Sequence, residues 1–170
     1  MRLRGVRIGG TRRRLRSEAF RVQRAPIYRI CLYATSAHTG VVHDPDCPCH
    51  SHALTEWQML QLAIAYTESK CNPDAVGASQ DLGILQIRPI YAREASRLAV
   101  DRVYAHSDAL DPLKSFEMFN IVQDHHNPAH EVSKAISLHN KADWYKRQVL
   151  LNLELIHRIE ATREIVLRYE

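Results

Sequence analysis

The stretch that decides the fold is ESKCNPDAVGASQDLGILQI, residues 68–87, which joins a strongly helical segment to an irregular loop. Upstream of it, apolar side chains recur at three- and four-residue steps from Trp57 onward, which is the periodicity of one helix face. Pro73 disfavours helical backbone at the residue before it, so we predict that the helix ends near Lys70. Glu68 is therefore expected in the last turn of this helix, on its inward side.

Outside this stretch the sequence is helical almost throughout from residue 54. Thr55 and Gln58 fit a capping box, in which the side chain of each residue accepts a hydrogen bond from the backbone N–H of the other. Aspartate and proline mark further helix starts, since aspartate caps a helix and proline fits its first turn. The expected helices cover residues 55–70, 89–100, 111–127, 128–140 and 143–169. With a short irregular or β-hairpin loop at 75–86, the sequence predicts a mainly α-helical domain.

A carboxyl group at the end of an apolar helix can serve as an acid. Burial disfavours its charged form and keeps it protonated near neutral pH, and a protonated carboxyl group can donate its proton to a glycosidic oxygen. Two glycines are expected to fold the loop so that Asp81 and Gln86 return past the helix end. Position alone leaves an alternative, in which Glu68 faces solvent beside Lys70, as charged side chains usually do.

Three motifs within residues 68–87 resemble the soluble lytic transglycosylase and goose-type lysozyme families of the lysozyme superfamily. They are Glu-Ser at 68–69, Asn-Pro-Asp-Ala at 72–75 and Gly-Ile-Leu-Gln at 83–86. The resemblance implies a lysozyme-like helical fold that acts on the peptidoglycan glycan strand without a cofactor or metal. It also implies that Glu68 is the general acid and later the general base, and that Gln86 lines the sugar cleft.

A later motif of these families, Ala-Tyr-Asn-x-Gly, is matched in part by residues 135–142. Asn140 stands at the motif asparagine, whereas His139 replaces the tyrosine that usually contacts the catalytic glutamate, and the glycine is missing. His139 either supplies the same hydrogen bond or packs as a structural residue. The expected substrate contacts are Ser69, Asp81, Gln86, Tyr91, His139 and Asn140.

Asp81 separates two versions of the reaction. The sequence at 81–87 also resembles animal-type lysozymes, in which this aspartate is the second carboxylate. A retaining hydrolase needs two carboxyl groups about 5–5.5 Å apart, whereas a lytic transglycosylase needs only the acid, because the muramic 6-hydroxyl closes a 1,6-anhydro ring. Asp81 also fits a capping role in the loop, since aspartates in turns often bond the nearby backbone.

We predict a lytic transglycosylase that cleaves the MurNAc–GlcNAc bond with Glu68 and forms 1,6-anhydro ends. One alternative is a lysozyme-type muramidase that hydrolyses the same bond, with Asp81 as its second carboxylate. An alternative of another class is a non-enzymatic protein that uses the same fold to bind the envelope or nucleic acid.

The charge distribution divides the chain in two. Residues 1–24 hold nine arginines and one acidic residue, whereas the rest carries 14 basic and 18 acidic side chains. We therefore expect a basic, poorly ordered N-terminal segment over 1–50 and a lysozyme-like transglycosylase domain over 51–170. An arginine-rich segment suggests an anionic partner, such as nucleic acid, a membrane surface or an acidic polymer.

Metal-ligating residue types gather around the predicted start of the domain, at Cys47, Cys49, His50 and His52. The cysteine spacing is shorter than in most zinc sites, so a metal site and a disulfide that involves Cys71 both stay open. No apolar run is long enough to span a membrane, and residues 27–37 form only an interrupted version of a signal peptide. We expect a monomer that acts in the cell envelope, in the periplasm, outside the cell or as part of a virion.

Overall fold

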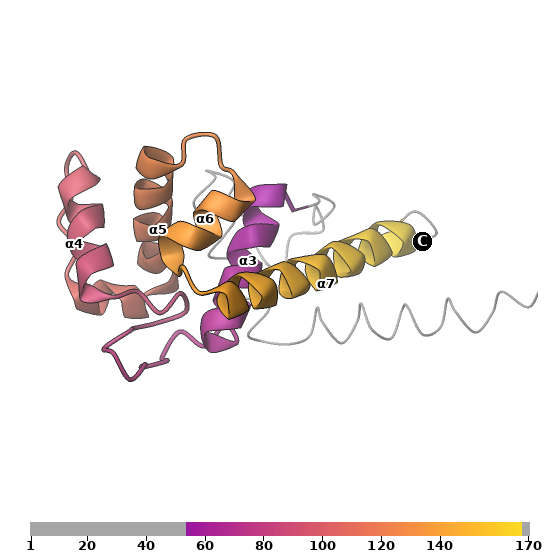
Figure 1. The fold of residues 1–170 in the computed structure, drawn as a ribbon, viewed down its shortest axis with the longest axis horizontal. Helices are drawn as coiled ribbons and strands as arrows, with labels where there is room; N and C mark the ends of the chain where they lie inside the picture. The colour runs from indigo at the N-terminus through magenta and orange to yellow at the C-terminus, as the bar shows by residue number, and fades with distance from the viewer. Residues whose placement is uncertain (1–53, 168–170) are drawn as a thin grey trace, which may run out of the picture.

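The computed structural model of the protein describes residues 54–167, with side-chain detail to residue 161. Five α-helices and one short 3-10 helix make up the described fold (Figure 1). They are α3 (Glu56–Ser69), α4 (Pro89–Leu98), η1 (His106–Leu110), α5 (Pro112–His126), α6 (Val132–His139) and α7 (Asp143–Leu167). The predicted mainly α-helical fold is confirmed. The loop after α3 is irregular, and within the described range it holds only the isolated β-bridges Val76–Leu82 and Leu82–Ile87.

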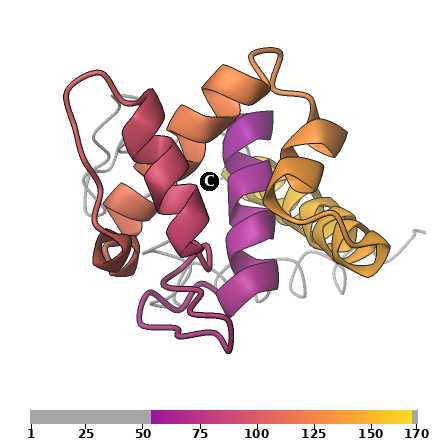
Figure 2. The ribbon, with the colours of Figure 1, turned by 60° about the vertical axis from the view of Figure 1, so that its left-hand side comes forward.

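Helix α3 runs through the middle of the domain, with α4 and α5 on one side and α7 packed across another (Figure 2). Its middle residues, from Gln58 to Ala65, are all buried, so this helix is enclosed on every side. The core around it is filled by large side chains with almost no exposure, among them Phe116, Phe119 and Tyr145. Burying an apolar side chain of this size contributes about 1.5–3 kcal/mol. This packing gives the last turn of α3 a fixed position from which Glu68 projects.

The start of α3 has the predicted capping box. The Gln58 backbone N–H donates to the Thr55 hydroxyl oxygen at 3.2 Å, and the Thr55 N–H donates to the Gln58 side-chain oxygen at 2.9 Å. Replacing Thr55 with Ala is therefore expected to lower the free energy of unfolding by about 1 kcal/mol, because one backbone donor loses its partner. Thermal unfolding monitored by circular dichroism measures the loss, and Thr55→Ser, which keeps the hydroxyl, is expected to stay close to the parent protein.

Helix α6 begins at Val132 and not at Pro128, so this predicted boundary is wrong by one turn. The Asn127 side chain accepts from the Glu131 N–H at 3.1 Å and donates to the Glu131 carbonyl at 3.0 Å, which closes a turn over 127–131. His130 takes a left-handed conformation within it, with φ of 51°. Proline fits a first helical turn, but here the asparagine side chain satisfies the backbone that the earlier helix start would have used.

Several expectations concern residues outside the described range. The basic segment over 1–50, the interrupted signal peptide and the metal-ligating residues at 47–52 all lie there. Cys71, which is described, is buried and is not a free thiol. Within residues 54–167, no helix is long and apolar enough to cross a membrane, and no group of His, Cys, Asp or Glu is arranged to hold a metal ion.

Candidate active site

Glu68 lies in the last turn of α3, as predicted, and its side chain is only 17% exposed. The chain leaves the helix through Lys70 and Cys71, which both adopt left-handed backbone conformations with φ of 55° and 60°. This sharp reversal carries the chain back along the helix end. Glu68 is therefore enclosed at the end of the helix, as one of the two sequence-based alternatives proposed. The other alternative, in which Glu68 faces solvent beside Lys70, does not match the structure.

The loop after α3 is fastened to the helix end by the Ser69 hydroxyl, which donates to the Ile84 carbonyl at 2.8 Å. Gln86 holds the loop from within, because its side-chain amide donates to the carbonyls of Ala75 at 3.1 Å and Gly83 at 2.9 Å. Both polar side chains were expected to contact substrate. In the structure the Ser69 hydroxyl and the Gln86 amide donate to backbone carbonyls instead. These two side chains order the loop that faces Glu68.

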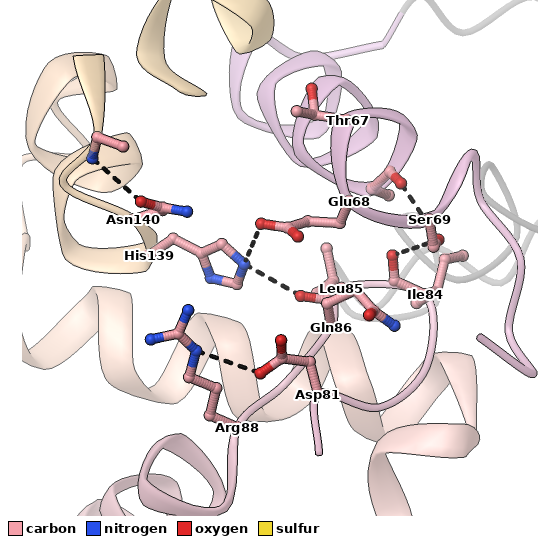
Figure 3. A network of polar contacts seen from close by, with 12 residues as sticks. Thr67, Glu68, Ser69, Asp81, Ile84, Leu85, Gln86, Arg88, His139 and Asn140 are labelled. Carbon is pink, nitrogen blue, oxygen red and sulfur yellow. Dashed lines mark hydrogen bonds and ion pairs between the residues drawn. The ribbon is translucent and has the colours of Figure 1, made fainter. Parts of the chain in front are cut away.

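His139 reaches the same place from the end of α6 (Figure 3). Its Nε2 atom lies 3.2 Å from Glu68 Oε1 and 3.0 Å from the Leu85 carbonyl oxygen. A carbonyl oxygen can only accept, so Nε2 carries a hydrogen and donates. The ring is 5% exposed, and Nδ1 is buried without a hydrogen-bond partner among the described residues.

Aromatic rings surround His139 and fix its orientation. The Tyr91 and Phe119 rings meet it edge-on, with centroid distances of 5.7 and 5.8 Å. The Tyr145 ring lies 6.2 Å away and tilted. Tyr91 thus supports His139, and its own hydroxyl donates to the Phe119 carbonyl at 3.5 Å. The two alternatives for His139 coexist, because the residue contacts Glu68 and is also packed in the core.

The pKa of Glu68 results from opposing influences. Burial raises it, whereas the hydrogen bond and charge of His139, the nearby Tyr145 hydroxyl and the charge of Arg88 lower it, and the net pKa lies below the ordinary value. The Tyr145 hydroxyl is itself buried. Its own pKa is raised by burial and by the charge of Glu68, so it stays neutral. The prediction that Glu68 rests protonated is therefore wrong, because three polar partners outweigh the effect of burial on its pKa.

Replacing His139 with Phe is expected to make the protein less stable at neutral pH, by about 1–3 kcal/mol, because a desolvated carboxylate loses its donor. A carboxyl group with a lowered pKa stabilises the fold above its unfolded pKa, and this contribution is lost as the pH falls through its folded pKa. The difference in free energy of unfolding between variant and parent, measured with urea, should therefore shrink as the pH falls below the ordinary pKa range of glutamate. In a Glu68→Gln background the same substitution should show a difference that does not change with pH, and a pH-dependent difference there would contradict the assignment.

Asp81 lies on the other side of the site, in an ion pair with Arg88. Its Oδ1 accepts from Arg88 Nε at 3.2 Å, and its side chain is 19% exposed. Among the described residues, the Asp81 side chain makes no hydrogen bond to Glu68 or to the loop backbone. Figure 3 shows the Asp81–Arg88 pair on the face of the loop below Glu68 and His139. Because the described hydrogen bond of the Asp81 side chain is to arginine and not to the loop backbone, the predicted capping role is wrong, whereas the role of second carboxylate stays a prediction.

Asn140 ends α6 and accepts from the Ala142 N–H at 3.0 Å, so its side chain orders the turn into α7. Two residues of the site were not singled out from the sequence: Arg88, which directly follows the loop motif, and Tyr145, which is buried on α7 beside Glu68. Arg88 could have been found from the sequence, because it directly follows the stretch at 68–87. Nothing local in the sequence distinguishes Tyr145 from any other core tyrosine.

Comparison with known protein families matches residues 51–137 to the transglycosylase SLT domain, which is half of the chain and includes Glu68 and the loop. Neither curated proteins nor solved structures give a significant match. Proteins with this domain act on peptidoglycan in the envelope or periplasm. The chain therefore belongs to the transglycosylase SLT domain family of the lysozyme-like superfamily, as a transglycosylase-type enzyme that cleaves glycosidic bonds of peptidoglycan.

Proposed function

We propose that the protein is a lytic transglycosylase that cleaves the MurNAc–GlcNAc bond with Glu68 as its one catalytic acid and base, and leaves 1,6-anhydro ends. The observation that carries the proposal is the arrangement of the two carboxyl groups. Glu68 is enclosed at the end of α3 beside His139, whereas Asp81 forms an ion pair with Arg88. One carboxyl group placed for proton transfer suits a reaction in which the substrate supplies its own nucleophile.

In the first step, protonated Glu68 donates its proton to the glycosidic oxygen, and the bond to C1 of the muramic sugar breaks with oxocarbenium character. In the second step, the 6-hydroxyl oxygen of the same sugar bonds to C1, and its proton passes to the Glu68 carboxylate. The hydrogen bond from His139 Nε2 supports the carboxylate between these steps. The lowered pKa means that Glu68 rests as the carboxylate, and the first step requires that bound substrate raise this pKa by excluding water.

Mass analysis of the products from purified peptidoglycan tests the proposal. We expect muropeptides that are lighter by one water than their reducing counterparts, which are the 1,6-anhydro products. Reducing ends would favour the muramidase, and the absence of any cleavage would favour the non-enzymatic binding protein. Asp81→Asn serves as the matched control, because a transglycosylase that uses Glu68 alone should still release anhydro products, whereas a muramidase would lose its second carboxylate.

We further propose that residues 51–170 form the catalytic domain. Its support is that the family match begins at residue 51 and that α7, beyond the match, packs against α3 and supplies Tyr145 to the site.

A further inference from the structure

We infer that Arg88 binds a carboxylate of the substrate and so makes the enzyme select strands that contain muramic acid over neutral amino-sugar polymers. The inference rests on the proposed function and names a specificity-determining residue for it. Three features of the described structure support it: the free edge of the Arg88 guanidinium, its fixed position beside Glu68, and its charge in a site with two carboxyl groups.

The first feature is the hydrogen bonding of Arg88. Its side chain is 59% exposed, and among the described residues it donates only through Nε, to Asp81. The terminal amino groups turn away from Asp81, toward the side of the site where His139 and Asn140 lie (Figure 3). A guanidinium presents its N–H groups in a planar fork that matches the two oxygens of a carboxylate. Asp81 therefore orients the group, and its outer edge is left for a ligand.

The second feature is the backbone on which Arg88 stands. Ile87 is buried with 1% exposure, and Pro89 begins α4 directly after Arg88. Arg88 is the N-terminal cap residue of that helix, in an extended conformation with φ of −82° and ψ of 155°. A buried residue on one side and a proline on the other hold its Cα in place. The guanidinium is therefore presented from a rigid position, and not from the tip of a loop.

The third feature is electrostatic. Glu68 is faced by His139 from α6, by Tyr145 from α7 and by Arg88, with Asp81 paired to Arg88, from the loop before α4. Of the groups that lower the pKa of Glu68, only Arg88 is exposed; His139 and Tyr145 are buried in the core. A ligand carboxylate bound to the outer edge of Arg88 would add a negative charge near Glu68, and the pKa of Glu68 would rise. The acidic substrate would thus favour the protonated Glu68 that the first step needs.

The chemistry of the strand supplies the ligand. Muramic acid differs from glucosamine by a lactyl ether whose carboxyl group is either free or joined to a peptide with carboxylates of its own. Chitin oligomers share the amino-sugar backbone and carry no carboxylate. A positively charged fork beside the cleavage site therefore distinguishes the two polymers by charge.

Calorimetric titration of the Glu68→Gln protein, which should bind without turnover, tests the inference. The ligands are a peptide-free GlcNAc–MurNAc tetrasaccharide, the same tetrasaccharide with its peptides, and chitotetraose. Adding Arg88→Met is expected to weaken binding of the muramic ligands by about ten-fold, the effect of one charged hydrogen bond, and to leave chitotetraose unchanged. Weaker binding of the peptide-free ligand assigns the contact to the lactyl carboxylate, and weaker binding of only the peptide-bearing ligand assigns it to the peptide.

Arg93→Met is the matched control, since Arg93 is an exposed arginine on α4. It should change none of the affinities, and thermal unfolding should show that each variant is folded. Unchanged binding of both muramic ligands in Arg88→Met, or an equal loss for all three ligands, would overturn the inference. Peptidoglycan cleavage by the parent protein is measured in parallel: cleavage without an Arg88 effect refutes only the inference, whereas no cleavage refutes the proposed function.

Discussion

Replacing Glu68 with Gln is expected to reduce peptidoglycan cleavage by about 10²–10⁴-fold, which is the usual contribution of a general acid and base. Glutamine keeps the shape of the side chain, and its oxygen can still accept from His139 Nε2, but it has no acidic proton to give. The release of soluble muropeptides over time, at several pH values, measures the loss.

The control for this prediction is Glu154→Gln, which removes an exposed carboxylate on α7 that pairs with Arg158. It should cleave peptidoglycan like the parent protein. Thermal unfolding should place the Glu68→Gln variant close to the parent as well, so that lost activity is not lost folding. Undiminished release of muropeptides by a folded Glu68→Gln protein would rule out the proposed mechanism.

Replacing Gly83 with Ala is expected to lower the free energy of unfolding by about 3–5 kcal/mol, among the largest effects of a single substitution. A Cβ atom at this position would lie 1.7 Å from the Ala109 carbonyl oxygen of η1, and the residue has φ of 74°, which side chains with a Cβ rarely adopt. The overlap is with backbone, so the loop and η1 would have to separate. Since domains of this size are stable by about 5–15 kcal/mol, urea unfolding should show a large loss.

Gly77→Ala is the matched substitution in the same loop. Its Cβ would lie 2.6 Å from the Gln86 side-chain oxygen, so the Gln86 amide would have to shift against its hydrogen bonds to the Ala75 and Gly83 carbonyls, but the atoms that the Cβ meets belong to side chains and not to the backbone. We expect a smaller loss of stability, about 1 kcal/mol, within the range of ordinary substitutions. A Gly83→Ala protein as stable as Gly77→Ala would show that the loop and η1 are not in close contact.

The helices were largely predictable because their starts depend on contacts within one turn. The Thr55 box and the Asp111 cap, whose Oδ1 accepts from the Leu113 N–H at 2.9 Å, are both found where the sequence places them. Where two local arrangements compete, the prediction failed. Pro128 permits a helix start, but the bonds between Asn127 and Glu131 close a turn in its place. The free energies of two such local arrangements differ by too little to be judged from residue types alone.

The position of Glu68 at the end of an apolar helix also followed from local signals, since periodicity and Pro73 define that end. Its charge state did not. It depends on His139, Arg88 and Tyr145, which come from separate elements, and electrostatic effects change steeply over a few ångströms. Burial alone predicted a raised pKa, and the assembled site gives a lowered one. Only the packing of α6 and α7 against α3 brings the deciding groups within reach.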